Sequence, residues 1–311
     1  MYKDLRVAVV VPAFKEQDHI ARVIAIMPAI VDHVVIVDDA SPDATYERAV
    51  SAADARTEVI RHEVNKGVGG AIITGHRRAL DLDADVSVVM AGDGQMDVEY
   101  LPQLLDPIAE AGYGFAKANR FFSATSFEGM PAYRVFGNIV LTFLTKMSSG
   151  YWNLVDPQNG YTAITRDALS RIPLDKVSER YEFENDLLIW LNIADVRAID
   201  VPIPAIYGEE VSGIRLHSVV PRLLGTLIGG FWRRFWRKYV LWSFSPIALL
   251  MLLGIPLFLF GFFTGIWAVA VSLAQPDTVS TGTWLLAVAP TLVGIQFLLQ
   301  AFVLDIEATP K

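Results

Sequence analysis

Two long uncharged runs near the C-terminus constrain the fold of this chain more than any other feature. Residues 245–271 and 284–303 contain no Asp, Glu, Lys or Arg. Each run is long enough to cross the roughly 30 Å hydrocarbon core of a bilayer as a helix. Pro290 and Gln296 interrupt the second run, but helices within membranes tolerate such residues. We therefore expect a two-helix transmembrane hairpin over residues 242–311, with a short outside turn near residues 275–282.

The segment before the hairpin, residues 218–241, mixes apolar and aromatic side chains with five basic ones, Arg222, Arg233, Arg234, Arg237 and Lys238. This composition is typical of amphipathic helices that lie in the membrane interface, with their basic groups on anionic headgroups. A solvated amphipathic helix of a soluble domain is the alternative interpretation. The positive-inside rule puts the basic residues, and with them both termini, on the cytoplasmic side. We therefore expect an integral protein of the cytoplasmic membrane.

Composition excludes several classes of function. The net charge of −8 argues against a general affinity for nucleic acid. The absence of cysteine excludes disulfides and thiolate metal sites. Residues 1–4 run directly into an apolar strand pattern, so we expect no cleaved signal peptide and a cytoplasmic N-terminal domain.

Residues 1–217 alternate apolar, β-branched runs with segments of helical spacing. Runs at residues 6–11, 34–37 and 58–61 and the run that begins at Val86 are typical of buried strands, and residues 17–30, 65–82 and 100–111 have helical spacing. This alternation predicts an α/β domain with a doubly wound, mostly parallel sheet. Ligands collect beyond the carboxyl ends of such strands. We therefore expect residues 12–16, 38–43 and 93–95 to share one crevice.

The run from Val86 stops abruptly at Gly92-Asp93-Gly94-Gln95. A carboxylate at a sheet edge, flanked by glycines that let a ligand approach the backbone, suits a divalent cation carrying phosphates. A polar turn between strand and helix is the alternative. An ordinary dinucleotide dehydrogenase is excluded, because no Gly-x-Gly-x-x-Gly follows the first strand and the glycines at 67, 69 and 70 have the wrong spacing.

Seven short motifs follow one another in an order that resembles the family-2 glycosyltransferases of GT-A fold, and more narrowly the polyprenyl- or dolichyl-phosphate sugar synthases. They are Val-Pro-Ala-Phe-Lys-Glu (11–16), Val-Asp-Asp-Ala-Ser-Pro-Asp-Ala-Thr (37–45), Asn-Lys-Gly-Val-Gly (65–69), Gly-Asp-Gly-Gln (92–95), Asn-Arg (119–120), Asp-Pro-Gln-Asn-Gly-Tyr (156–161) and Ser-Gly-Ile-Arg (212–215). The resemblance covers residues 5–215, and the membrane hairpin is similar to that of the bacterial branch.

The resemblance implies a site for a nucleotide diphosphate sugar, UDP- or GDP-linked. Pro12, Phe14 and Glu16 would flank the base and ribose, and Asp39 would contact the nucleoside. Further donor-binding candidates are Asp38, Lys66, Gly67, Gly92, Gln95 and Glu184. Asp93 and Gln95 would bind a divalent cation, Mg²⁺ or Mn²⁺, that bridges the diphosphate. The chain departs from the family at Ala91, where a first carboxylate usually stands; Gln95, diphosphate oxygens and water would then complete the metal site.

The implied reaction transfers a hexose, with inversion, to the phosphate of a polyprenyl lipid in the membrane. A phosphate monoester is already ionised near pH 7, so it attacks without a strong general base. Arginine suits the two anionic substrates because its fork bonds two oxygens. The candidates are Arg120, Arg134 and Arg215, and Lys117 and His217 are secondary candidates. A surface or structural salt bridge is the alternative for each arginine.

Three carboxylates leave their roles open. Asp156 would orient the acceptor, act as a base, or merely cap the turn before Pro157. Glu184 and Asp186 would face the sugar, or simply balance a helix N-terminus. We interpret His62 and His76 as ordinary surface or core residues.

Two other functions fit the same motifs. Transfer to a lipid hydroxyl such as diacylglycerol would require Asp156 or Asp186 as general base. A nucleotide-sensing membrane protein without catalysis is the second alternative, and Ala91 gives it some support. The basic interfacial helices and the small hairpin also predict self-association into a homo-oligomer.

Overall fold

The computed structural model describes residues 1–121, 132–204, 216–275 and 278–310; for residues 132–134 and 216–219 it describes the backbone. These residues form two compact units, the described residues of 1–232 together with residue 310, and those of 233–309. We describe each unit by itself.

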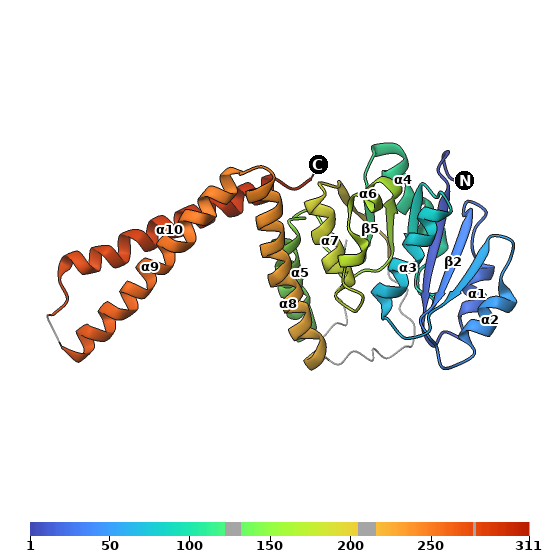
Figure 1. Ribbon diagram of the computed structural model, residues 1–311, viewed down its shortest axis with the longest axis horizontal. Coiled ribbons are helices and arrows are strands. Elements are labelled where there is room, and N and C mark those ends of the chain that lie inside the picture. Colours follow the sequence, from blue (N-terminus) through green and yellow to red (C-terminus); the bar gives the residue numbers. More distant parts are fainter. Residues whose placement is uncertain (122–131, 205–215, 276–277, 311) are drawn as a thin grey trace. The chain divides into compact units, whose positions relative to one another are not determined.

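The first unit is built on a seven-stranded sheet with the order β3-β2-β1-β4-β6-β5-β7 (Figure 1). The strands are β1 Val7–Ala13, β2 His33–Asp38, β3 Thr57–Arg61, β4 Val86–Val89, β5 Phe115–Asn119, β6 Thr162–Thr165 and β7 Ala198–Pro202. β6 runs antiparallel to both of its neighbours, and the other pairs are parallel. The predicted α/β fold with a mostly parallel sheet is therefore confirmed, and β7, which ends at Pro202, lies at the edge of the sheet.

Helices cover both faces of this sheet (Figure 1). The helices up to residue 234 are α1 Ile20–Ala25, α2 Thr45–Ala52, α3 Val68–Asp81, α4 Leu101–Ala111, α5 Ala132–Ser149, α6 Arg166–Arg171, α7 Phe183–Ile193 and α8 Leu216–Arg234, with short 3₁₀ turns η1 Val98–Tyr100 and η3 Leu174–Lys176. The helix predicted over residues 17–30 is shorter than expected. α1 ends before Pro28, whose ring cannot be accommodated inside a continuing helix.

The central strands are apolar on both sides because both of their faces are covered. Val7, Val9 and Val11 of β1 pack with α1 and α4, whereas Val10 packs on the opposite face with Ala71 of α3. α3 lies so close to β1 that a Cβ at Gly75 would collide with the Val10 side chain. This packing fixes the height of α3, and of the loop before it, above the sheet.

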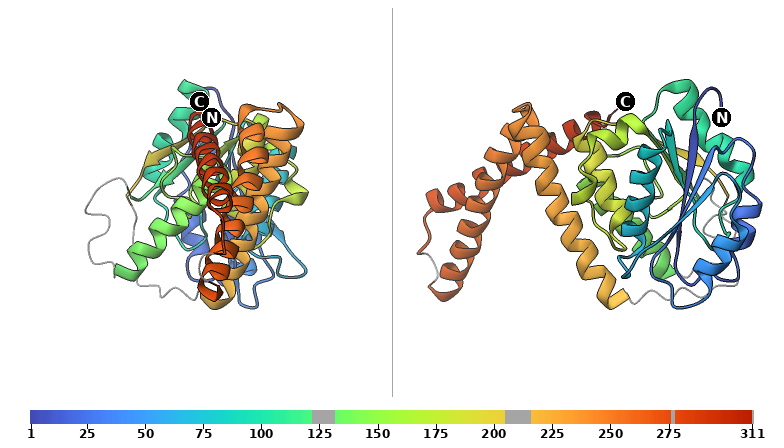
Figure 2. Two further views of the ribbon diagram at one scale, coloured as in Figure 1. Left: turned by 90° about the vertical axis from the view of Figure 1, so that its left-hand side faces the viewer. Right: turned by 45° about the vertical axis from the view of Figure 1, so that its right-hand side comes forward.

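The second unit contains the π-helix η4 Phe235–Leu241 and the long helices α9 Pro246–Ala274 and α10 Thr281–Glu307 (Figure 2). Small buried residues recur every seven positions along both helices, at Gly254, Gly261 and Ala268 and at Ala287, Gly294 and Ala301. A Cβ at Gly294 would lie 2.5 Å from the Phe258 backbone nitrogen, so the small residues are what allow the two backbones to approach.

Both long helices are apolar and long enough to cross a membrane. Only 22% and 17% of their most apolar windows are buried, so the apolar side chains face outward, as a lipid-exposed hairpin requires. Near the base of the hairpin, Arg234 forms a bidentate pair with Asp305, at 2.6 and 3.1 Å, and both also hydrogen-bond the Tyr239 hydroxyl. The pair ties the end of α8 to the end of α10, and the Tyr239 hydroxyl joins η4 to the same group.

Candidate active site

The loop after β4 lies against the end of β1. A Cβ at Gly92 would lie 3.1 Å from the Pro12 carbonyl oxygen and 3.2 Å from Glu16 Cγ, so a glycine is what allows this contact. Asp93 is partly buried, and its Oδ1 accepts a hydrogen bond from the Gln95 backbone N–H at 2.9 Å. The structure therefore brings the residues expected to hold the cation beside those expected to flank the nucleoside.

The end of β2 is joined to the same edge. The Asp39 N–H donates to the Ala13 carbonyl at 2.9 Å, which holds the ends of β2 and β1 together. Its buried carboxylate accepts from the backbone N–H groups of Lys66, at 2.9 Å, and Gly67, at 2.7 Å. Asp39 thus fixes the loop that leads into α3. Asp38, fully buried, is paired with Arg61 at 3.3 Å.

Gly67 has the backbone conformation that favours glycine, with φ +93°. A Cβ there would lie 2.7 Å from the Glu179 carbonyl oxygen, and the Gly70 N–H donates to that oxygen at 2.9 Å. The loop before α3 is therefore in contact with the segment that leads into α7. Phe14 stands exposed after β1, with the Lys15 ammonium 5.4 Å from its ring centre.

Arg120, which follows β5, and Asp156, in the segment before β6, form a bidentate pair. Nε of Arg120 donates to Oδ2 at 2.7 Å and Nη2 donates to Oδ1 at 3.0 Å, while the Arg120 backbone N–H also donates to Oδ2 at 3.1 Å. Asp156 is fully buried. Burial alone would raise the pKa of Asp156, but the hydrogen bonds and charge of Arg120 outweigh burial and hold that pKa below its ordinary value.

Lys117 lies beneath this pair, buried in β5. Its ammonium donates to the Asn159 carbonyl, and burial lowers its pKa although Asp156, Glu184 and Asp200 act in the opposite direction. Burial raises the pKa of Asp200 on β7 to about 6. Lys117 and Asp156, which are buried, form a network of charge with the partly buried Glu184 and Asp200 near the turn at residues 156–161.

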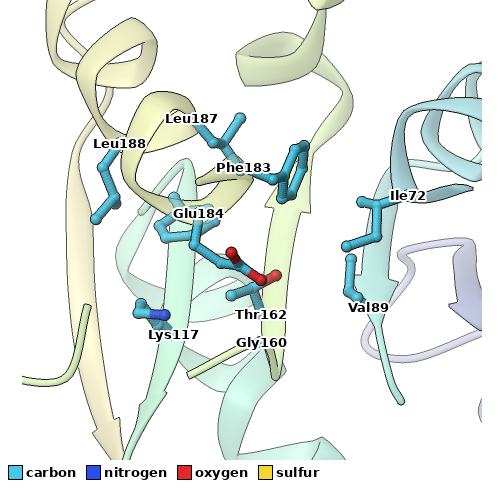
Figure 3. Close-up of a pocket in the computed structure, with 10 residues that line it drawn as sticks. Ile72, Val89, Lys117, Gly160, Thr162, Phe183, Glu184, Leu187 and Leu188 are labelled. Carbon is cyan, nitrogen blue, oxygen red and sulfur yellow. The ribbon is translucent and has the colours of Figure 1, made fainter. Parts of the chain in front are cut away.

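Glu184 of α7 points into a pocket that Lys117, Gly160 and Thr162 also line (Figure 3). Loss of hydration there raises the pKa of Glu184. A Cβ at Gly160 would lie 3.6 Å from Met96 Cε and 3.8 Å from Glu184 Oε1. The turn at 156–161, the loop after β4 and the start of α7 therefore meet at one point.

The remaining predicted residues are not brought into this network by the described part of the chain. Arg134 belongs to α5 and His217 to α8, but their side chains lie outside what the structure describes. Arg215 lies outside the described residues altogether. Asp186 is buried, and its Oδ2 accepts from the Ser178 N–H at 2.9 Å.

The residues after β4 fit a divalent cation of the Mg²⁺ or Mn²⁺ type. Across the described ranges, no cluster of three or more His, Asp or Glu residues has metal-ligand geometry. Such a cluster is not needed, because Mg²⁺ is usually held by one or two carboxylates together with substrate phosphates. Asp93 would supply one carboxylate and Gln95 an amide oxygen, and Ala91 stands where a second carboxylate would be expected.

Two polar residues beside the site received no role from the sequence: His62, which is buried and was interpreted as an ordinary surface or core residue, and Asp200, which is partly buried. His62 follows β3 as Asp39 follows β2, and the register pairs Asp38 with Arg61, so the two residues had to be neighbours. Asp200 is paired in register with Lys117. Both neighbours follow from the register of adjacent strands. That register depends on which strands are adjacent, and a single strand's sequence does not show this.

The fold is that of the GT-A class of glycosyltransferases. The chain belongs to the family described as glycosyl transferase family 2, whose sequence profile matches residues 8–172. It is 30% identical over 221 residues to a UDP-N-acetylglucosamine–dolichyl-phosphate N-acetylglucosaminyltransferase of Methanococcus voltae, covering 66% of this chain and 88% of the relative. It is also 30% identical to an undecaprenyl-phosphate mannosyltransferase of Micrococcus luteus, covering 66% of this chain and 85% of that protein.

Among solved structures, the fold is similar to glucosyl-3-phosphoglycerate synthase from Mycobacterium tuberculosis, determined with Mn²⁺, UDP and phosphoglyceric acid. The TM-score is 0.57 at 20% identity, over 73% of this chain and 79% of that one. This likeness concerns the fold.

Proposed function

We propose that this protein transfers a hexose, with inversion, from a UDP- or GDP-linked sugar to the phosphate of a polyprenyl lipid. Relatives that share about 30% of their residues with this chain are named for transfer to dolichyl and undecaprenyl phosphates. One observation carries the choice of acceptor, namely the state of Asp156.

Asp156 is a poor general base. Both of its oxygens accept hydrogen bonds from Arg120, and its pKa lies below the ordinary value, so it has little tendency to take a proton. A lipid hydroxyl must lose a proton as it attacks, whereas a lipid phosphate has lost its proton already. Asp186, the other candidate base, accepts from the backbone N–H of Ser178. The chemistry of the site therefore favours a phosphate acceptor.

Arg120 has the complementary role. Asp156 holds its guanidinium plane in one orientation, and such a plane bonds two phosphate oxygens at once. In our proposal Arg120 receives the acceptor phosphate, and Arg134 and Arg215 assist it. Asp156 acts by positioning Arg120.

The donor would lie across the ends of β1, β2 and β4. Pro12, Phe14 and Glu16 would flank the base and ribose, and the loop at Lys66 and Gly67, held by Asp39, would close that side. A divalent cation held by Asp93 and Gln95 would supply Lewis-acid stabilisation of the departing diphosphate. Glu184 would face the sugar from α7.

The C-terminal segments would bring this domain to its lipid substrate. In this proposal residues 218–241 lie on the cytoplasmic face of the membrane, α9 and α10 cross it, and both termini remain inside. The isoprenoid chain would then stay in the bilayer while its phosphate reaches Arg120. Self-association through the hairpin is part of the same proposal, and crosslinking in detergent that gives only monomer would contradict it.

An acceptor screen tests the proposed function. The purified full-length protein would be incubated with UDP- and GDP-sugars and Mn²⁺, with undecaprenyl phosphate, dolichyl phosphate or diacylglycerol as acceptor. We expect glycolipid from a polyprenyl phosphate and none from diacylglycerol. Product from diacylglycerol alone would favour the hydroxyl route, and no turnover of any donor would favour a non-catalytic sensor.

A further inference from the structure

The outward face of α5 carries four apolar side chains that are 39–68% exposed, and we call them the α5 stripe. They recur at helical spacing and are Phe136, Ile139, Val140 and Phe143. Within residues 135–149, where the side chains of this helix are described, the buried ones are all polar, namely Thr145, Ser148 and Ser149. An amphipathic helix of a soluble domain has the opposite arrangement, with its apolar side against the core. The α5 stripe therefore marks an interaction surface.

The buried side of α5 ties the helix to the acceptor end of the site. Thr145 Oγ1 donates to Asn185 Oδ1 at 2.9 Å, and the same oxygen accepts from Gln158 Nε2 at 3.1 Å. Asn185 is fully buried on α7, and Gln158 belongs to the turn that carries Asp156. Because one amide oxygen receives both hydrogen bonds, Asn185 fixes the position of α5 relative to this turn.

α8, a second helix with exposed apolar side chains, packs on α5. Ser148 Oγ donates to the Leu227 carbonyl at 2.7 Å, and a Cβ at Gly230 would lie 3.2 Å from the same hydroxyl. The two helices accordingly lie side by side (Figure 1). The exposed apolar side chains of α8 are Val220, Leu224, Ile228 and Trp232. α5 is therefore the neighbour of a helix that our proposal places on the membrane surface.

The charge around the α5 stripe fits an anionic surface. Residues 129–155 contain Arg134 and Lys146 but no Asp or Glu, although the whole chain has a net charge of −8. Basic residues beside an exposed apolar face are typical of helices that bind anionic lipid headgroups.

The size of the stripe also favours a lipid surface over a second copy of this chain. An aromatic side chain offers about 150–250 Å² when it is buried completely, so four partly exposed apolar side chains offer on the order of 400 Å². That is about half of the roughly 800 Å² that each partner buries in a stable protein interface.

We propose that the α5 stripe is a membrane-contact surface of the catalytic domain and holds the turn at residues 156–161 at the level of anionic lipid headgroups. The contact itself is argued from the exposed side chains, whereas its benefit to catalysis rests on the proposed function, in which Arg120 beside this turn receives a lipid phosphate. Since Asn185 links α5 to the turn, seating the stripe among the headgroups sets how far the phosphate is from Arg120.

Fluorescence quenching on the full-length protein in vesicles tests the contact and needs no catalysis. The chain has no cysteine, so each introduced cysteine accepts one fluorophore at one position. Ile139→Cys and Phe143→Cys carry the label on the α5 stripe. Val50→Cys on α2 is the matched control, because Val50 and Phe143 are both 48% exposed. In vesicles of phosphatidylcholine and phosphatidylglycerol, we expect nitroxide-bearing lipids to quench the labels at residues 139 and 143 several-fold more than the label at residue 50.

Equal quenching by lipid at residues 50 and 143 would overturn the proposal. Self-quenching between labels at residue 143 of two molecules, in place of quenching by lipid, would overturn it too, because a second copy would then cover the stripe. The double variant Ile139→Ser/Phe143→Ser should keep the Tm of the wild-type protein in detergent. A fall of several degrees would mean that another segment of the chain covers these side chains, which also contradicts the proposal.

Acceptor kinetics in the same vesicles test the consequence for catalysis. We expect Ile139→Ser/Phe143→Ser to raise the KM for undecaprenyl phosphate about tenfold and to leave the donor KM nearly unchanged, because less apolar surface is buried in the membrane. Val50→Ser should behave as wild type. An unchanged acceptor KM would overturn the positioning role of the stripe. If the wild-type protein glycosylates no acceptor, the proposed function fails, while the quenching result still decides whether α5 contacts lipid.

Discussion

Replacement of Asp156 by Asn separates a positioning role from a catalytic one. Asn retains one oxygen that can accept from Arg120, but it loses the negative charge and the second of two bonds, at 2.7 and 3.0 Å. A hydrogen bond to a charged group is worth about 1.5–3 kcal/mol. At about 1.4 kcal/mol per factor of ten, kcat/KM for the polyprenyl phosphate acceptor should fall by roughly 10- to 150-fold.

The assay is the initial rate of glycolipid formation at saturating donor, with the acceptor varied and the pH run from 5 to 9. We expect most of the loss in the acceptor KM, and an acid limb of the pH profile that is the same in Asp156→Asn and wild type. Arg120→Lys is the matched variant, because it keeps the charge but cannot form the two-pronged pair. A loss of more than about 10⁴-fold in kcat, together with disappearance of the acid limb, would identify Asp156 as the base and refute the reasoning.

Three further predictions concern the metal, the loop after β4 and the buried charge. Asp93→Asn should reduce activity by more than about a hundredfold, because it removes the one carboxylate we assign to the cation. Ala91→Asp should lower the Mn²⁺ concentration that gives half-maximal activity, and Asp97→Asn is the control. A fully active Asp93→Asn variant would mean that the metal site is misplaced. Gly92→Ala should raise the donor KM several-fold, since its Cβ would lie 3.1 Å from the Pro12 carbonyl, while Gly137→Ala, which meets no atom within 4 Å, should not; equal KM values would contradict the contact. The pKa of Asp200 is raised to about 6, so its contribution to stability is complete below the ordinary pKa of Asp and is lost as the pH rises through about 6. Tm should therefore fall between about pH 4 and 6, and Asp200→Asn should abolish this fall. If the variant keeps the same pH dependence of Tm, Asp200 is not the group that causes it.

Much of the fold was predictable because the strands are buried on both faces. A strand such as β1 needs apolar residues at every position, which makes it visible without any neighbour. Right-handed connections then put the ends of β1, β2 and β4 on one edge, and the contact of Gly92 with Pro12 and Glu16 agrees with that expectation. The reversed direction of β6 was not predictable, since its residues alternate no differently from those of a parallel strand.

The pairs that define the site were harder to foresee. Arg120 and Asp156 are 36 residues apart, and His62 and Asp39 are 23 apart, so no local pattern joins them. Arg120 was singled out for its chemistry and Asp156 for its turn, but their pairing depends on β5 and β6 being adjacent. His62 could not be distinguished from any other buried histidine, because its partners Asp39 and Thr74 come from the end of β2 and from α3.

The linkage in the product tests the central claim most directly. The glycolipid formed from undecaprenyl phosphate would be purified and examined by ¹H–³¹P correlation NMR. We predict a phosphodiester, with the phosphorus coupled to the anomeric proton of the sugar and an anomeric configuration opposite to that of the donor. A sugar attached through a hydroxyl, with the lipid phosphate still a monoester, would contradict the account.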